Sequence, residues 1–168
     1  MGRYRPPQPK AAPYITPRGY ADLQGEQNAL WTRRNDVTKA VTAAAAEGDR
    51  SENAEYIYRK KELREIDRRI RYLQKRMPEL TVVNTLPDNK AQIFFGAWIT
   101  LEKEDGTKIT CRIVGADETG RQKEYISMDA PLAKALMKKF SGDDVPVHTP
   151  AGEILYHVLN VEYEPQDE

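Results

Sequence analysis

Apolar residues recur every three or four positions in two long stretches, and this spacing predicts two long helices. The first opens at Thr16-Pro17, an N-cap residue followed by proline at the first helical position. The second opens near Asp49 and runs to about Met77, where Pro78 ends it. Because only a short break separates them, the two apolar stripes can be buried by folding back on each other. The pattern therefore predicts an antiparallel coiled-coil hairpin over residues 16–78.

The predicted seam of this hairpin has seven positions on each helix. On the first helix they are Leu23, Gln27, Leu30, Arg34, Val37, Val41 and Ala44, and on the second Tyr56, Arg59, Leu63, Ile66, Ile70, Leu73 and Met77. The steps alternate between three and four, as in a heptad repeat, and a few polar residues interrupt the apolar positions.

After Pro78 the pattern changes to short alternating runs that are typical of strands. The predicted strands are Ile93–Phe95, Ala97–Glu102, Lys108–Val114, Tyr125–Met128, Val145–Thr149 and Glu153–Tyr163, with one helix at Pro131–Phe140. Strands with one inserted helix make an α+β domain, which we place at residues 91–164. Residues 79–90 are then a linker, residues 165–168 an acidic tail, and the proline-rich residues 1–15 a disordered basic arm.

The net charge of zero conceals two halves of opposite sign. Residues 1–76 hold 17 Lys+Arg against 10 Asp+Glu, or +7, whereas residues 77–168 hold 9 against 16, or −7. This distribution excludes a uniformly basic nucleic-acid-binding domain. A single cysteine excludes a disulfide framework, and no apolar run approaches the ~20 residues of a membrane span. We therefore expect a cytoplasmic protein with no membrane partner.

The usual catalytic residue sets are absent from the sequence. His148 and His157 lie in predicted strands without a second metal ligand at a suitable spacing, and Cys111 fits a small core residue. The glycines form no phosphate-binding loop. The sequence therefore gives no indication of an enzyme.

Acidic residues at the break between the two helices have two interpretations. Asp49 and Glu52 fit a capping box, with Asp49 as the N-cap, and this interpretation is favoured by spacing alone. Alternatively, with Glu55 they share one helical face, and the carboxylates of Asp49 and Glu52 would hold a divalent cation if a partner supplied further oxygens. The two interpretations are compatible.

The segment Arg59–Arg76 carries nine basic residues against three acidic ones. One interpretation is a solvated helix face with i,i+4 ion pairs. Six surplus positive charges in 18 residues exceed what such pairs neutralise, so phosphates of RNA or DNA are the alternative partner. The interleaved Tyr56, Tyr58 and Tyr72 offer aromatic faces for bases, although Tyr56 also suits the seam.

Several ordered motifs resemble one protein family. The string Gly48–Tyr56 resembles the tip motif of the bacterial Gre transcript-cleavage factors, and Lys60–Leu73 is similar to their GreB branch. Phe94–Trp98 and Thr149–Glu153 are similar to the C-terminal domain of that branch. The resemblance covers about residues 16–164.

This resemblance implies a fold and a function. The fold is the hairpin followed by an FKBP-like α+β domain, and the function is that of a monomeric transcription elongation factor. It would enter the secondary channel of backtracked RNA polymerase and stimulate endonucleolytic cleavage of the RNA 3′ end, without being an enzyme itself. It would reach the nucleoid through the polymerase.

The resemblance also implies residue roles. Asp49 and Glu52 would be catalytic and share a Mg²⁺ that the polymerase completes; none would be bound by this chain alone. Asp129 and Pro131 would dock on the polymerase. The residues implied to bind RNA are Arg59, Lys60, Lys61, Arg64 and Arg68.

The sequence departs from the family at Asn35-Asp36, at Glu62 within the basic run and at Ala130 in the docking loop. Two other functions stay open. One is a channel-binding regulator or inhibitor of RNA polymerase without cleavage stimulation, against which the retained Asp49 and Glu52 argue. The other is a prolyl isomerase, indicated only by the FKBP-like label.

Overall fold

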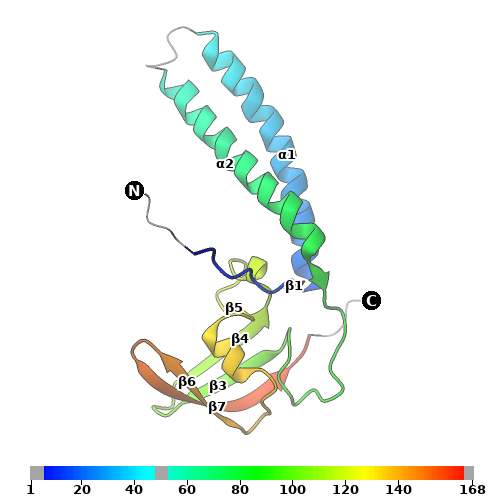
Figure 1. The fold of residues 1–168 in the computed structure, drawn as a ribbon, viewed down its shortest axis with the longest axis vertical. Helices are drawn as coiled ribbons and strands as arrows, with labels where there is room; N and C mark the ends of the chain where they lie inside the picture. Colours follow the sequence, from blue (N-terminus) through cyan, green and yellow to red (C-terminus); the bar gives the residue numbers. More distant parts are fainter. Residues whose placement is uncertain (1–5, 48–52, 165–168) are drawn as a thin grey trace. The chain divides into compact units, whose positions relative to one another are not determined.

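The computed structural model describes residues 6–47 and 53–164, and these form two compact units. One unit is Arg18–Leu80, and the other combines the segment up to Pro17 with the chain from Thr81 onward. Figure 1 shows two long helices in the first unit and a sheet with one short helix in the second. The predicted α+β class, with a helical hairpin before a sheet domain, is thus confirmed. No helix in the described ranges is long and apolar enough to cross a membrane.

Helix α1 spans Pro17–Ala45 and helix α2 spans Ala54–Arg76. Proline at the first position of α1 is favourable because its missing N–H would have no partner there. After α2, the short 3-10 helix η1, Met77–Glu79, contains Pro78, which cannot continue the regular hydrogen bonding. Both helix ends near Pro17 and Pro78 agree with the sequence prediction.

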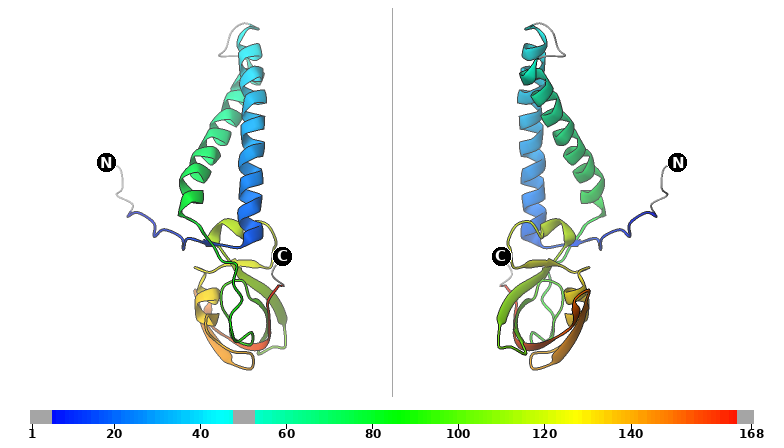
Figure 2. Two further views of the ribbon diagram at one scale, coloured as in Figure 1. Left: turned by 90° about the vertical axis from the view of Figure 1, so that its right-hand side faces the viewer. Right: turned by 90° about the vertical axis from the view of Figure 1, so that its left-hand side faces the viewer.

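The two helices run antiparallel and pack through apolar side chains (Figure 2). The buried centre of the contact is Val37 of α1 with Ile66 and Ile70 of α2. The half-buried Leu30, Val41 and Leu63 pack around it. All six residues belong to the predicted seam, so the heptad pattern identified the inner faces of both helices.

The second unit contains a five-stranded sheet with the order β5-β4-β3-β7-β6. Its elements are β3 Trp98–Lys103, β4 Lys108–Val114, β5 Tyr125–Ser127, α3 Pro131–Leu136, β6 Asp144–Thr149 and β7 Gly152–Glu162. Neighbouring strands are antiparallel except for β4 and β5, which are parallel. Apolar residues that alternate along the strands, such as Ile99 and Leu101 of β3, are fully buried in one core with Leu136 of α3.

Two predicted elements of this unit differ from the structure. Ile93–Phe95 is not a strand; instead Ile93 exchanges backbone hydrogen bonds with Lys138 and Lys139, and its side chain is fully buried. The predicted helix Pro131–Phe140 ends at Leu136, because Met137 leaves the helical conformation with ψ of 131°. Lys138 then adopts a left-handed backbone conformation with φ of 67°. Apolar content alone did not distinguish these irregular buried segments from regular ones.

The prediction of a disordered arm over residues 1–15 is wrong at its C-terminal end. Strand β1, Tyr14–Ile15, pairs in parallel with β2, Thr81–Val82. The Ile15 side chain is fully buried. The Glu118 carboxyl group accepts hydrogen bonds from the backbone N–H and the hydroxyl of Thr16. A buried apolar side chain and a buried acceptor therefore hold this segment against the sheet domain.

Candidate functional site

The predicted catalytic residues Asp49 and Glu52 lie outside the described residues. The structure nevertheless locates the start of the following helix, because Asn53 has an extended backbone (φ −81°, ψ 99°) and α2 begins at Ala54. Asp49 and Glu52 therefore precede α2. The N-cap of α2 is thus Asn53, whereas the capping-box interpretation expected Asp49. The helical face that Asp49 and Glu52 were expected to share with Glu55 involves residues outside the described ranges and stays a prediction.

Asn53 is the cap that the sequence analysis missed. Its Oδ1 accepts a hydrogen bond of 3.1 Å from the backbone N–H of Tyr56, and its Nδ2 donates one of 2.8 Å to the carbonyl oxygen of Ala44. One side chain thus links the start of α2 to the end of α1. The available signal was Asn followed two positions later by Glu55, since asparagine is a strong N-cap and acids favour the first helical turn.

The outer face of α2 carries a continuous row of exposed basic side chains, here called the basic stripe. Its members are Lys60, Lys61, Arg64, Arg68, Arg71 and Lys75. Steps of three and four positions keep these residues on one side of the helix, away from the seam. In the part of the chain that the structure describes, none of the six forms an ion pair. The structure thus groups four predicted RNA-binding residues and adds Arg71 and Lys75.

Arg59, the fifth predicted RNA-binding residue, is not part of the basic stripe. Its guanidinium donates to Glu55 at 2.8 Å and to Glu62 at 3.0 Å. These hydrogen bonds, that with Glu55 foremost, raise the pKa of Arg59. Glu62 also accepts from Arg33 of α1 at 2.8 Å, and this bond holds the pKa of Glu62 below its usual value. The RNA-binding role of Arg59 stays a prediction.

Further ion pairs join the two helices along the inner edges of the hairpin. Arg34 of α1 donates to Asp67 of α2 at 2.7 Å. Arg69 of α2 donates to both carboxylate oxygens of Glu26 of α1, at 2.6 and 3.0 Å. Two of the three acids within Arg59–Arg76, Glu62 and Asp67, are therefore used to join the helices and do not neutralise the basic stripe.

Of the predicted docking residues, Asp129 lies between β5 and α3, whereas Pro131 belongs to α3. The backbone N–H of Asp129 donates to the Ser127 hydroxyl at 3.1 Å. Its carboxylate accepts a hydrogen bond of 3.0 Å from the backbone N–H of Ala12. Pro131 is exposed and is the first residue of α3. The loop therefore presents an exposed proline next to an oriented carboxylate.

The histidines and the cysteine show no catalytic arrangement. His157 contacts Asp144 at 2.7 Å and His148 contacts Glu153 at 3.6 Å, each pair lying across β6 and β7. Burial raises the pKa of the Cys111 thiol to about 11, so it is a poor nucleophile. Within residues 6–47 and 53–164, no group of three or more His, Cys, Asp or Glu side chains is placed to hold a metal ion.

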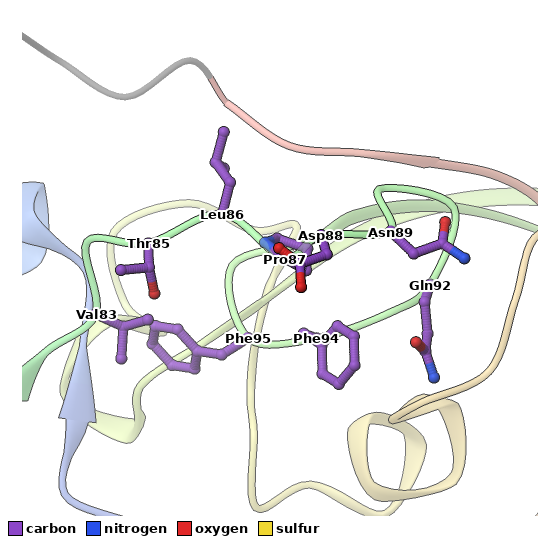
Figure 3. A pocket seen from close by; sticks show the side chains of 9 residues that line it. All are labelled: Val83, Thr85, Leu86, Pro87, Asp88, Asn89, Gln92, Phe94 and Phe95. Atoms are coloured by element: carbon purple, nitrogen blue, oxygen red, sulfur yellow. The ribbon is translucent and has the colours of Figure 1, made fainter.

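One pocket of about 430 Å³ lies beside the segment that was predicted to be a linker (Figure 3). Its lining is Val83, Thr85, Leu86, Pro87, Asp88, Asn89, Gln92, Phe94 and Phe95. Figure 3 shows the Phe95 ring next to Val83, whereas Leu86 points away. The only titratable side chain of this lining is Asp88, so the pocket has no acid–base pair and we assign it no chemistry.

Comparison with known proteins covers almost the whole chain. Residues 13–82 match the family model described as transcription elongation factor, N-terminal, and residues 88–163 match the one described as transcription elongation factor, GreA/GreB, C-term. The chain is 54% identical over 166 residues to the transcription elongation factor GreB of Pseudomonas aeruginosa, with 98% of this chain and 99% of that protein covered.

A second relative and a solved structure complete the comparison. The transcription elongation factor GreB of Xanthomonas axonopodis pv. citri is 52% identical over 165 residues, with 97% and 98% covered. The crystal structure of GreA factor homolog 1 (Gfh1) of Thermus thermophilus aligns with 89% of this chain and 97% of its own, with 22% identity and a TM-score of 0.40.

Proposed function

Because this chain belongs to the GreA/GreB family of transcription elongation factors, we propose that it binds backtracked RNA polymerase and stimulates cleavage of the extruded RNA 3′ end. The observation that carries this proposal is the basic stripe. Six cations that form no ion pair within the described residues run along α2, and Asp49 and Glu52 precede this helix in the sequence. A row of cations next to two carboxylates suits an RNA strand whose end is to be cleaved.

The basic stripe would bind the phosphates of the extruded RNA. Lys60 and Lys61 lie nearest to the loop, and Arg64 and Arg68 continue the row along the helix. Phosphate binding by unpaired lysine and arginine side chains depends on charge and not on base sequence. Such binding is required of a factor that acts on any transcript.

Asp49 and Glu52 would hold a Mg²⁺ ion shared with the polymerase. Carboxylate oxygens are suitable ligands for this ion, but two side chains cannot supply six oxygens, so the polymerase would complete the site. When bound, the ion would lower the pKa of a water molecule and stabilise the leaving oxygen. The chain itself would therefore be a cofactor protein and not an enzyme.

The loop of Asp129 and Pro131 would dock on the polymerase at the rim of its secondary channel, through which the hairpin enters. Ser127 and Ala12 orient the loop through the two hydrogen bonds of Asp129. A fixed loop loses little conformational freedom on binding, which favours docking.

The test uses stalled, backtracked elongation complexes with labelled RNA and Mg²⁺. We expect the wild type to release 3′ fragments and Asp49→Ala with Glu52→Ala to release almost none while still competing for the polymerase. Glu47→Ala, which removes an acid just before the loop, is the matched control and should cleave normally. The proposal fails if the wild type releases no fragments or if the double variant cleaves equally well. Binding without cleavage by the wild type would indicate an inhibitor.

A further inference from the structure

Two large apolar side chains stand next to each other at the start of α2. Ile57 is 52% exposed and Tyr58 is 60% exposed, more than any other large apolar residue in the described ranges. Single exposed apolar residues are common on protein surfaces and need no explanation. Two large apolar side chains that are both more than half exposed within one helical turn are unusual and point to a binding surface.

This Ile57–Tyr58 pair lies at the loop end of the basic stripe. Ile57 precedes Lys60 and Lys61 by three and four positions, and Tyr58 precedes Lys61 by three. Residues at these spacings are neighbours on a helix surface. The outer face of α2 thus changes from cationic side chains to an aliphatic and an aromatic side chain as it approaches the loop.

The Tyr58 ring is supported from the inner edge of the hairpin. The guanidinium carbon of Arg59 lies 5.5 Å from the centre of the ring. Hydrogen bonds to Glu55 and Glu62 fix this guanidinium, and Glu62 is itself bound to Arg33 of α1. The ring therefore rests on a cation that two carboxylates hold in place, while most of its surface is exposed.

We propose that the Ile57–Tyr58 pair stacks an unpaired nucleobase near the 3′ end of the RNA whose phosphates lie along the basic stripe. The inference rests on the proposed function and adds a base-binding site to it. Charge complementarity favours RNA as the ligand of this pair. An RNA strand whose phosphates lie along the basic stripe also has bases close to the stripe. Stacking on an aromatic ring accepts every base, since each base has a π face. An apolar contact with the polymerase itself is the alternative outcome of the test.

The experiment measures cleavage and stacking in backtracked elongation complexes. RNA carries 2-aminopurine, a fluorescent base quenched by stacking, at one of its last three positions. Tyr58→Ala should abolish the quenching caused by the wild type and raise the half-saturating factor concentration roughly 5- to 100-fold, the range supplied by one aromatic stacking contact. Tyr58→Phe keeps the ring and should retain both properties. Phe140→Ala, which removes another exposed aromatic ring, in the sheet domain, is the matched control and should cleave like the wild type.

An abasic nucleotide distinguishes base stacking from other roles. When the quenched position is made abasic, the wild type and Tyr58→Ala should cleave with the same half-saturating concentration. If Tyr58→Ala retains its full defect on abasic RNA, or if no position shows quenching, the proposal is wrong and the pair contacts the polymerase. These results require that the wild type cleaves RNA. Its failure to cleave would instead overturn the proposed function.

Discussion

Both faces of α2 carry basic side chains, but these side chains have different partners on the two faces. On the inner edges, Arg59, Glu62, Asp67 and Arg69 are all engaged in ion pairs, and three of them bind side chains of α1. On the outer face, the six cations of the basic stripe have no ion pair within the described residues. Charges on the inner edges stabilise the hairpin, whereas those on the outer face are available to a ligand.

This difference shows why the number of charges in a segment does not define its role. The surplus of basic residues in Arg59–Arg76 predicted a polyanion partner, with i,i+4 pairing as the alternative. The pairing interpretation applies to Arg59 on the inner edge, and the polyanion partner stays a prediction for the outer face. Arg59 pairs with Glu55 at i,i+4, while the stripe residues form no ion pair within the described residues. Variants that remove either an ion pair of the inner edges or a cation of the basic stripe can therefore test each face separately.

The largest expected effect is a loss of stability on removing the buried carboxyl group of Glu118. Glu118 is 1% exposed and accepts hydrogen bonds from Thr16 and, at 2.9 Å, from the backbone N–H of Gly115. Glu118→Ala leaves these buried donors without an acceptor and should lower the free energy of unfolding by about 3–5 kcal/mol. Urea denaturation measures the loss.

The same variant should loosen one segment first. The amides of Thr81 and Val83, which donate to the carbonyls of Pro13 and Ile15, should exchange hydrogen faster in Glu118→Ala. Glu104→Ala, an exposed acid in the turn between β3 and β4, is the control and should change stability by less than about 0.5 kcal/mol. Equal losses in both variants would show that Glu118 does not hold the N-terminal segment.

Sequence patterns predicted regular elements well and long-range polar contacts poorly. The heptad spacing identified Val37, Ile66 and Ile70 as core, and the alternation in Lys108–Val114 matched β4 along its full length. These signals are local, because one helix or strand repeats them. The pairing of Ile15 with Val82 joins residues that are far apart in the chain, and no local pattern around Ile15 predicts it.

The candidate site was predicted in part. Four of the six residues of the basic stripe were implied to bind RNA by the resemblance to the Gre factors, and helical spacing places all six on one side of α2. Arg59 was expected both in the seam and among the RNA-binding residues, and its hydrogen bonds to Glu55 and Glu62 of the same helix place it with the ion pairs of the inner edge. Asn53 was missed because Asp49 and Glu52 fitted the capping pattern better, and choosing between the caps required the observed start of α2.

The next largest effect concerns the outer face. Lys60→Glu with Lys61→Glu should raise the half-saturating concentration for cleavage roughly tenfold, equivalent to about 1.4 kcal/mol of binding free energy. The loss should be larger for deeply backtracked RNA, which has more extruded phosphates. The slope of log affinity against log salt should fall by about 1.4, because each phosphate contact with a single strand contributes about 0.7.

The matched control for this pair is Lys138→Glu with Lys139→Glu, two adjacent exposed lysines of the sheet domain. It makes the same change in net charge and should leave the salt slope unchanged. Urea denaturation should give nearly wild-type stability for the Lys60 and Lys61 variant, since neither residue forms an ion pair within the described residues and only the contact of Lys60 with the Tyr56 ring is lost. Equal cleavage losses on deep and shallow complexes would show that these lysines act in polymerase docking alone.

A smaller effect is expected on the inner edges. Arg34→Met removes the 2.7 Å bond to Asp67 but keeps the aliphatic part of the side chain. Both partners are partly exposed, so the hairpin should lose about 0.5–1 kcal/mol of unfolding free energy, measured by the helical circular dichroism signal in urea. Lys39→Met, on the same helix and without an ion pair in the described ranges, should change it less. A loss of cleavage without a loss of stability in Arg34→Met would mean that the inner edge also binds a ligand.

The smallest effect is a pH dependence at Glu62. Hydrogen bonds from Arg33 and Arg59 hold the pKa of Glu62 below its usual value. The folded chain therefore binds fewer protons at this site than the unfolded chain near the ordinary glutamate pKa of about 4.3. The resulting stabilisation is fully present above that pH and is lost as the pH falls through the lower pKa of the folded state.

Glu62→Gln should consequently be less stable than the wild type at neutral pH, and the two should converge as the pH is lowered below about 4. Urea denaturation at several pH values measures the difference, and Glu65→Gln is the control because Glu65 forms no ion pair within the described residues. A difference that stays constant from neutral to acidic pH would show that Glu62 acts through packing and not through its charge. If the difference instead disappears on acidification while cleavage by Glu62→Gln at neutral pH equals that of the wild type, the inner edge stabilises the hairpin and leaves RNA binding to the basic stripe.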